Sequence, residues 1–147
     1  ILPEVWEDEF LNLQSRFRRG IFSHETALFL WDLTDRTPNY YYMTFPSSYN
    51  LAKPKENHVK CVQSAKTLYG LGITILRTPG GNEVKVYCME RTLCDILRPN
   101  SRVDIQIVTD AFKRYTARQD KNIPLLSEYA KKLKVEKRLR AYLEVLL

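Results

Sequence analysis

The sequence predicts an α+β fold in which the β-strands are clustered between two groups of helices. Apolar residues recur every three or four positions over the first 33 residues, and again from Glu90 to the C-terminus. Between these parts, short β-favouring runs are separated by turn-forming residues. Strands that are grouped and do not alternate with helices favour α+β over α/β. We expect two N-terminal helices, a small sheet of about four strands with a hairpin near residues 73–88, and a C-terminal group of about four helices.

The length and composition are those of one domain with a buried core. The chain has 147 residues, of which 44% are hydrophobic and 27% charged. We expect a single domain over residues 1–147, with 1–100 as an α+β core and 101–147 as a helical extension. No apolar run approaches the roughly 18 residues of a membrane span, and no secretory signal is visible. We therefore expect a cytoplasmic protein without membrane attachment, and the first residue, Ile rather than Met, suggests a fragment.

Two helices are expected before residue 34. The first would cover about residues 5–18 and end at Gly20. Its apolar stripe, spaced i, i+4, i+7 and i+11, consists of Trp6, Phe10, Leu13 and Phe17. Ser23 is a favourable N-cap for a second helix that would reach about Leu33.

The middle of the chain contains the strand candidates. They cover residues 40–45, 58–63, 73–76 and 84–88. Pro79-Gly80-Gly81-Asn82 would form the turn of a hairpin between the last two. Pro46 would end the first strand, and residues 46–57 are expected to be an irregular loop. Residues 64–71 fit neither a helix nor a strand pattern clearly.

Four helices are expected after the hairpin. They would begin near Glu90, near Ser101, near Asn122 and shortly before Leu139. Pro99 would terminate the first of them. Ser101 and Asp104 resemble a capping box at the start of the second. Arg91 and Asp95 are four positions apart, so we expect them to pair on the helix surface.

The cysteine and histidine residues do not form a metal-binding pattern. Cys61, Cys88 and Cys94 are odd in number and none of them is in a CxxC pair. The chain has only two histidines, which makes a zinc site unfavourable. We expect mostly buried, reduced thiols, no metal and no cofactor.

Two pairs of residues are candidates for catalytic groups. His24 and Glu25 are adjacent, so on a helix they point about 100° apart and do not converge on one substrate atom. Glu83 and Lys85 have the E-x-K spacing of a class of metal-dependent nucleases and would share one strand face. That chemistry also needs an upstream Asp, and no Asp occurs between residues 36 and 94. We expect a protein that is not an enzyme, with a cryptic metal-dependent nuclease as the alternative.

The net charge is +6, and residues 101–147 hold eleven Lys or Arg residues against six Asp or Glu. A positive face of this kind favours contact with phosphate groups. Because few aromatic residues are interleaved with the cations, backbone phosphates are favoured over base stacking. A solvated helix surface explains the same charge equally well. The candidate nucleic-acid-binding residues are Lys113, Arg114, Arg118, Lys131, Lys132, Lys134, Lys137, Arg138 and Arg140.

Five segments, taken in order along the chain, resemble the AbiEi family of bacterial antitoxins. The segments are Trp6–Phe10, Phe22–Leu28, Leu33–Arg36, Glu90–Asp95 and Tyr142–Leu147. Each is short, but the five occur in register and the resemblance runs along essentially the whole chain. In that family a winged helix-turn-helix precedes this region, and Ile1-Leu2-Pro3 is similar to the end of its last wing strand.

The resemblance implies a type IV toxin–antitoxin role in phage abortive infection. The functional partner would be a nucleotidyltransferase-like toxin, which the antitoxin counters without a stable complex. The full-length protein would also repress its own promoter by binding inverted repeats in the DNA, mainly through the winged helix. This chain would be the C-terminal domain that provides antitoxicity and cooperative operator binding. No catalytic residues accompany the resemblance.

Two non-catalytic alternatives remain open at this point. The last three helices could form an auxiliary nucleic-acid-binding surface, as their charge suggests. The chain could also be a dimerisation module, because repressors of inverted repeats often pair by two-fold symmetry, giving a homodimer on DNA.

Overall fold

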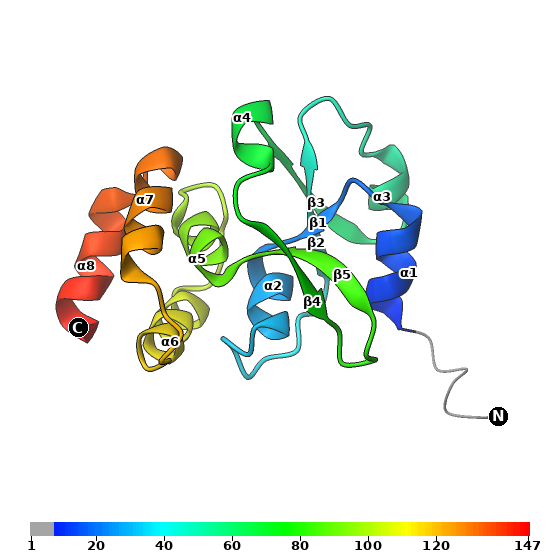
Figure 1. Ribbon diagram of the computed structural model, residues 1–147. Coiled ribbons are helices and arrows are strands. Elements are labelled where there is room, and N and C mark those ends of the chain that lie inside the picture. The colour runs from blue at the N-terminus through cyan, green and yellow to red at the C-terminus, as the bar shows by residue number, and fades with distance from the viewer. Residues whose placement is uncertain (1–7) are drawn as a thin grey trace.

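The computed structural model describes residues 8–147 and confirms the α+β class. N-terminal helices and a five-stranded mixed sheet are followed by a C-terminal group of helices (Figure 1). The strands are β1 (Ile21–Phe22), β2 (Tyr41–Pro46), β3 (Val59–Ser64), β4 (Ile73–Arg77) and β5 (Glu83–Tyr87). The helices are α1 (Glu9–Arg16), α2 (His24–Leu30), α3 (Ala52–Glu56), α4 (Lys66–Tyr69), α5 (Met89–Leu97), α6 (Ile105–Thr116), α7 (Ile123–Leu133) and α8 (Glu136–Leu146).

The sheet has the strand order β3-β2-β1-β5-β4. β4 and β5 form the expected antiparallel hairpin, with Ile75 opposite Lys85. β2 pairs in parallel with β3 and antiparallel with β1. The two-residue strand β1 joins the two halves of the sheet, because it also pairs in parallel with β5 through Phe22 and Val86. This central strand was missed by the sequence analysis, which expected about four strands.

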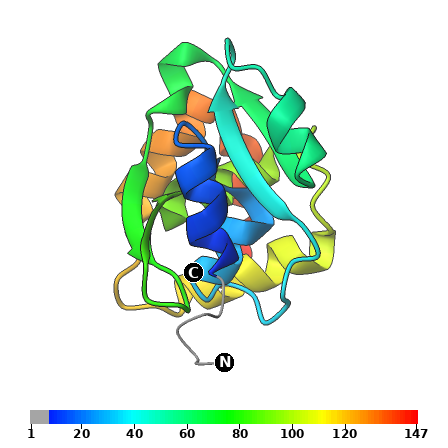
Figure 2. The ribbon, with the colours of Figure 1, turned by 90° about the vertical axis from the view of Figure 1, so that its right-hand side faces the viewer.

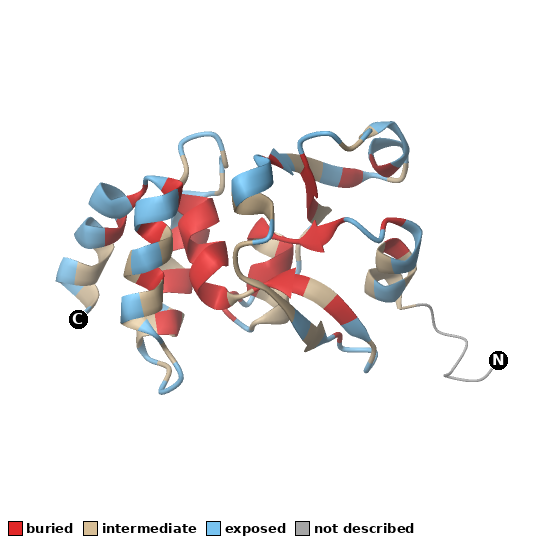
Figure 3. Cartoon of the chain, turned by 45° about the horizontal axis from the view of Figure 1, so that its top comes forward, coloured by how far each residue is buried: buried red, intermediate tan, exposed pale blue. Residues whose placement is uncertain are grey.

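Helix α5 lies between the sheet and the C-terminal helices, and all nine of its residues are buried (Figure 3). On one side, apolar residues of α5 pack with α6, α7 and α8 into a helical core. A second core lies between α1 and the sheet and includes Leu13, Phe22, Met43 and Val86. A helix that is buried all round needs no polar face, yet α5 contains Glu90, Arg91 and Asp95. Those three charged residues therefore require partners inside the protein.

Helix α1 crosses the face of the sheet that is turned away from the C-terminal helices (Figure 2). It begins after Asp8, whose carboxylate caps the helix by accepting from the amides of Phe10 and Leu11. The same carboxylate accepts from Thr78 and, at 2.8 Å, from Asn82, so it also anchors the β4–β5 turn. The expected helix over residues 5–18 is thus shorter at its C-terminal end, and Trp6 lies outside the described residues.

Two short helices occupy segments for which no helix was expected. α3 lies within the predicted irregular loop of residues 46–57, and this prediction was wrong. α3 contains Pro54, and proline is normally taken to break a helix, so the sequence pattern did not indicate a helix here. α4 lies in the segment 64–71 that fitted no pattern clearly.

Side-chain caps define the starts of two of the C-terminal helices, α6 and α7. Asp104 is the N-cap of α6 and accepts from the amide of Gln106 at 2.8 Å. Ser101, expected to be that cap, instead donates its hydroxyl to the Ile96 carbonyl at 3.0 Å. Asn122 caps α7 by accepting from Leu125 at 3.1 Å, which confirms the expected start of that helix. No helix within residues 8–147 is both long and apolar enough to cross a membrane.

Candidate functional site

Six of the nine candidate cations lie around the corner between α7 and α8, which we call the basic corner. These exposed residues are Lys131, Lys132, Lys134, Lys137, Arg138 and Arg140. Lys134 makes the corner possible because its backbone is left-handed, with φ of 61°. The amide of Val135 then donates to the Ala130 carbonyl at 2.9 Å, and Val135 becomes buried. Buried apolar residues on both sides of the turn therefore leave its lysines outside.

The basic corner is not uniformly positive. Lys131 and Arg140 line a groove between α7 and α8 together with Glu136 and Glu144. The two carboxylates offset the two cations locally, which reduces the attraction of this groove for phosphate. Lys132, Lys134 and Lys137 do not line that groove.

The other three candidate cations belong to α6 and its C-terminal end. Arg114 pairs with Asp110 at 2.9 Å and approaches Asp35 at 3.9 Å. Arg118 pairs with Asp120 at 2.8 Å and donates to the Trp31 carbonyl at 3.0 Å. These two arginines join the C-terminal helices to the end of α2. Lys113 is exposed.

The structure therefore divides the nine candidate residues into two groups. Lys113, Arg114 and Arg118 precede α7, whereas the basic corner begins in its last turn, with Lys131 and Lys132. The eight residue steps from Ile123 to Lys131 separate the two groups by about 12 Å along the helix axis, at about 1.5 Å per residue.

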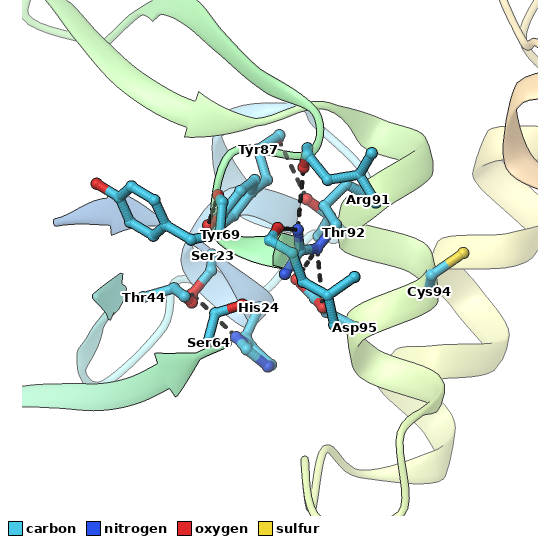
Figure 4. A network of polar contacts seen from close by, with 12 residues as sticks. Ser23, His24, Thr44, Ser64, Tyr69, Tyr87, Arg91, Thr92, Cys94 and Asp95 are labelled. Carbon is cyan, nitrogen blue, oxygen red and sulfur yellow. Dashed lines mark hydrogen bonds and ion pairs between the residues drawn. The ribbon is translucent and has the colours of Figure 1, made fainter. Parts of the chain in front are cut away.

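A buried polar network that the sequence analysis did not anticipate joins α5 to the sheet (Figure 4). At its centre is Arg91, which has a relative exposure of 1%. Its Nε lies 3.1 Å from both carboxylate oxygens of Asp95, and its Nη1 donates to the carbonyls of Leu68 at 2.5 Å and Leu71 at 3.0 Å. The prediction that Arg91 and Asp95 pair was correct, but their expected place on the surface was wrong.

The ring of Tyr87 completes the surroundings of Arg91. The guanidinium carbon lies 4.3 Å from the ring centroid, which is the geometry of a cation–π contact. The Tyr87 hydroxyl donates to the Tyr69 carbonyl at 2.6 Å, and burial raises the pKa of this phenol. The Tyr87 carbonyl accepts from Thr92 at 3.2 Å and Trp31 at 2.9 Å. These bonds fix the junction between β5 and α5.

Gly72 lies against this network and has little free space around it. Its φ is +84°, and a Cβ added there would lie 2.9 Å from the Arg91 Cβ and 3.1 Å from the Cys88 sulfur. Its carbonyl accepts from the Cys88 amide at 2.8 Å. A residue with a side chain would be strained in its backbone and would displace the arginine.

His24 lies at the other side of the network and is also buried. The Thr44 hydroxyl donates to Ser23 Oγ at 2.8 Å, and Ser23 Oγ lies 2.9 Å from His24 Nδ1. Ser23 can therefore donate its own proton to the ring nitrogen, which suits a neutral imidazole. Burial lowers the pKa of His24, and the positive charges of Arg91 and Arg98 add to this, whereas Asp95 opposes it. Because Ser23 is engaged in this way, it makes no side-chain cap at the start of α2.

Glu90 is bound on the side of α5 that faces the helices. The Tyr115 hydroxyl donates to Glu90 Oε2 at 2.5 Å and accepts from the Asn122 amide at 2.7 Å. Burial and the contact with Glu90 raise the pKa of the Tyr115 phenol, so it remains a hydrogen-bond donor. Within residues 8–147, every buried side-chain nitrogen or oxygen has a hydrogen-bond partner.

The E-x-K pair lies on β5, with Glu83 exposed and Lys85 half-buried. The Lys85 ammonium donates to the Arg18 carbonyl, and burial together with the nearby Arg19 lowers its pKa. Over the described part of the chain, no three His, Cys, Asp or Glu side chains are grouped so that they could hold a metal ion. In this structure Lys85 thus fastens β5 to the end of α1.

The three cysteines are free thiols, with Cys94 buried and the other two partly buried. The Cys94 sulfur points away from the network and lies 3.7 Å from the Leu126 carbonyl (Figure 4). Burial raises its pKa to about 12, and the neighbouring Asp95 adds to this. Burial also raises the pKa of Cys61 and Cys88, so thiolates are disfavoured at all three positions.

No known protein-family model matches this chain, and no curated protein matches it significantly in sequence.

Removing one partner of the Arg91–Asp95 pair is expected to destabilise the protein strongly. Asp95→Ala would leave the guanidinium buried with an unmatched charge, at a cost of about 3–5 kcal/mol. The double variant Arg91→Met/Asp95→Leu would recover part of this loss, because it removes both charges and keeps apolar volume. Urea unfolding followed by circular dichroism measures both changes. If the double variant were less stable than Asp95→Ala, the unmatched charge would not be the cause of the lost stability.

The buried His24 predicts a loss of stability at acidic pH. Its pKa is lower in the folded state than in the unfolded state, so the unfolded state binds more protons once the pH falls below about 6.5. The contribution of His24 to the free energy of unfolding is therefore fully present above that pH. It decreases as the pH falls towards the folded-state pKa of His24. Urea midpoints at pH 7.5 and 5.5 measure the decrease. In His24→Asn, which tolerates the left-handed backbone at φ of 52°, the decrease should be smaller; an equal decrease would exclude His24 as its source.

Proposed function

We propose that this chain is a regulatory domain of an AbiEi-type antitoxin and acts without catalysing a reaction. Its role would be to counter a nucleotidyltransferase-like toxin in a type IV toxin–antitoxin system. A winged helix joined to it would bind inverted repeats in the promoter and repress transcription. The proposal places the protein in the cytoplasm.

The positions of the resembling segments support this proposal. Phe22–Leu28 forms β1 and α2, and Glu90–Asp95 lies in α5. These two segments contain His24, Arg91 and Asp95 of the buried network and Glu90. Two of the five resembling segments therefore supply residues that hold the sheet to the helices, as expected for a shared scaffold.

The observation that supports a non-catalytic role most directly is the burial of the groups that would otherwise suggest chemistry. Catalytic acids and bases must reach a substrate atom, directly or through one water. His24, Arg91 and Asp95 are at most 5% exposed. Each has a hydrogen-bond partner inside the protein: Arg91 and Asp95 pair with each other, and His24 contacts the Ser23 hydroxyl. Their arrangement satisfies buried polar groups and does not present a reactive group at a surface.

Toxin neutralisation in growing cells tests the proposal. The full-length protein would be expressed together with its proposed partner, a nucleotidyltransferase-like toxin, and colony formation would be counted. We expect restored growth with the wild type and with Glu83→Ala, because no nuclease centre is involved. Glu83 is exposed, so its replacement leaves the fold intact.

Two outcomes would contradict the proposal. Failure of the wild-type protein to restore growth would remove the antitoxin assignment. Loss of rescue in Glu83→Ala, with an unchanged thermal unfolding midpoint, would instead favour the metal-dependent nuclease.

A second candidate function is an auxiliary nucleic-acid contact at the basic corner, favoured by its six exposed cations. Binding of a 24-base-pair duplex of arbitrary sequence by this chain would then weaken steeply with salt. Lys131→Gln/Lys132→Gln/Lys137→Gln should reduce the slope of log affinity against log salt by up to about 2.7, at about 0.9 for each lost phosphate contact. The matched control removes the same charge elsewhere, at the exposed Lys53, Lys55 and Lys66. Equal slopes for the two triple variants would exclude the corner as the contact surface.

A further inference from the structure

A groove of about 360 Å³ lies where the end of α5 and the start of α6 meet α8. Its apolar lining includes Val103, Ile105, Val108 and Tyr142. We propose that this groove, called the arginine groove below, binds an acidic amphipathic helix of a partner protein. The proposal does not depend on the antitoxin assignment.

The charge of the arginine groove has one sign. Arg98, Arg102 and Arg138 line it, and no Asp or Glu is among its lining residues. The groove between α7 and α8 is the useful contrast, because there two lysine or arginine residues are matched by Glu136 and Glu144. A partner for the arginine groove must therefore supply negative charge as well as apolar side chains.

One of the three arginines, Arg138, and the backbone of the turn that carries the other two are held in place before any partner binds. Arg138 Nη1 donates to the Leu97 carbonyl at 2.7 Å. The turn after α5 is closed by the Ser101 amide, which donates to the Arg98 carbonyl at 3.0 Å. The Ser101 hydroxyl ties the same turn to Ile96. Because Arg138 and the backbone of this turn are already ordered, that part of the conformational entropy is not lost on binding.

Exposed apolar side chains lie in the groove and continue from it along α8. Ile105, at the start of α6, is 65% exposed, and Val145 on α8 is 81% exposed. Val145 follows Arg138 and Ala141 at the spacing i, i+3, i+7, so these three residues share one face of α8. Figure 3 shows this helix at the outside of the molecule, with pale blue along its outer face.

A helix is a better fit to this surface than a nucleic acid. Phosphates would satisfy the arginines but would leave the aliphatic floor and Ile105 exposed to water. An amphipathic helix with Leu at helical spacing and Glu along its edges covers both kinds of surface at once.

The test uses a defined probe, an 18-residue fluorescein-labelled peptide with Leu at i, i+3 and i+7 and Glu at most other positions. A scrambled peptide of the same composition, which has no apolar face, is the control. Fluorescence anisotropy measures the affinity, and methyl NMR locates the site. We expect saturable binding of the patterned peptide, at least about tenfold tighter than the scrambled one, with shifts concentrated at Ile105 and Val103.

Four variants separate the contributions of charge and of apolar surface. Arg102→Glu and Arg102→Glu/Arg138→Glu should weaken binding by about tenfold or more, whereas Arg140→Glu, in the mixed-charge groove, should change it less than about twofold. Ile105→Ser should weaken binding about fivefold at constant charge. Arg102 and Ile105 are exposed, so these two single variants test the site even if loss of the Arg138–Leu97 bond disturbs folding.

The proposal is overturned if the patterned peptide does not bind at millimolar concentration or binds no better than the scrambled one. It is also overturned if Ile105→Ser has no effect, because the attraction would then be purely electrostatic. Stronger binding of a DNA duplex, lost in Arg102→Glu, would assign the arginine groove to nucleic acid instead.

Discussion

The structure depends on one buried charge, the guanidinium of Arg91. Four groups surround it: the Asp95 carboxylate, the carbonyls of Leu68 and Leu71, and the ring of Tyr87. An isolated charge in such a place would be prohibitively unfavourable, so the segments that provide these partners must come together for the chain to fold. They are the α4–β4 connection, the end of β5 and α5 itself. One side chain thereby couples the sheet to the helix that supports the C-terminal half.

Helix α5 transmits this coupling to the surfaces at which we place function. Its residues Leu93, Ile96 and Leu97 belong to the helical core that also contains Leu133 and Leu139, the residues on either side of the basic corner. The carbonyl of Leu97 holds Arg138 over the arginine groove. The corner and the groove therefore take their geometry from α5, whose own position is set by the buried network. Neither surface is formed by α8 alone.

Local periodicity was enough to predict most of the helices and the hairpin. The stripe of Leu93, Ile96 and Leu97 and the cap at Asn122 are signals contained within a few residues. Strand β1 has only two residues, and its existence depends on pairing with β2 and β5, which are distant in sequence. No local pattern contains that information. Pro54 similarly concealed α3.

The candidate site was predictable in its charge and not in its arrangement. The sequence showed nine cations near the C-terminus, but only the fold separates those that bind Asp110 and Asp120 from those that face solvent. Arg98 and Arg102 were not predicted as site residues, because they lie at the end of α5 and in the loop after it. Arg138 is distant from them in sequence and meets them only where α8 packs beside α5. For Arg91 and Asp95 the spacing indicated a pair. Their burial could not be predicted, because it is produced by residues from other elements, such as Tyr87 of β5 and Gly72, which pack against Arg91.

The buried network also explains why this scaffold has a defined arrangement of its two halves. Replacing a buried ion pair by apolar residues is often neutral or stabilising, so Arg91 and Asp95 are not best understood as a source of stability. Their hydrogen bonds are directional, and only one placement of α5 lets Arg91 reach both Leu68 and Leu71 while contacting Tyr87. A purely apolar contact would tolerate a shift of α5 along the sheet, whereas the hydrogen bonds of Arg91 would be broken by such a shift. Specificity of the sheet–helix arrangement is therefore the physical role we assign to the network.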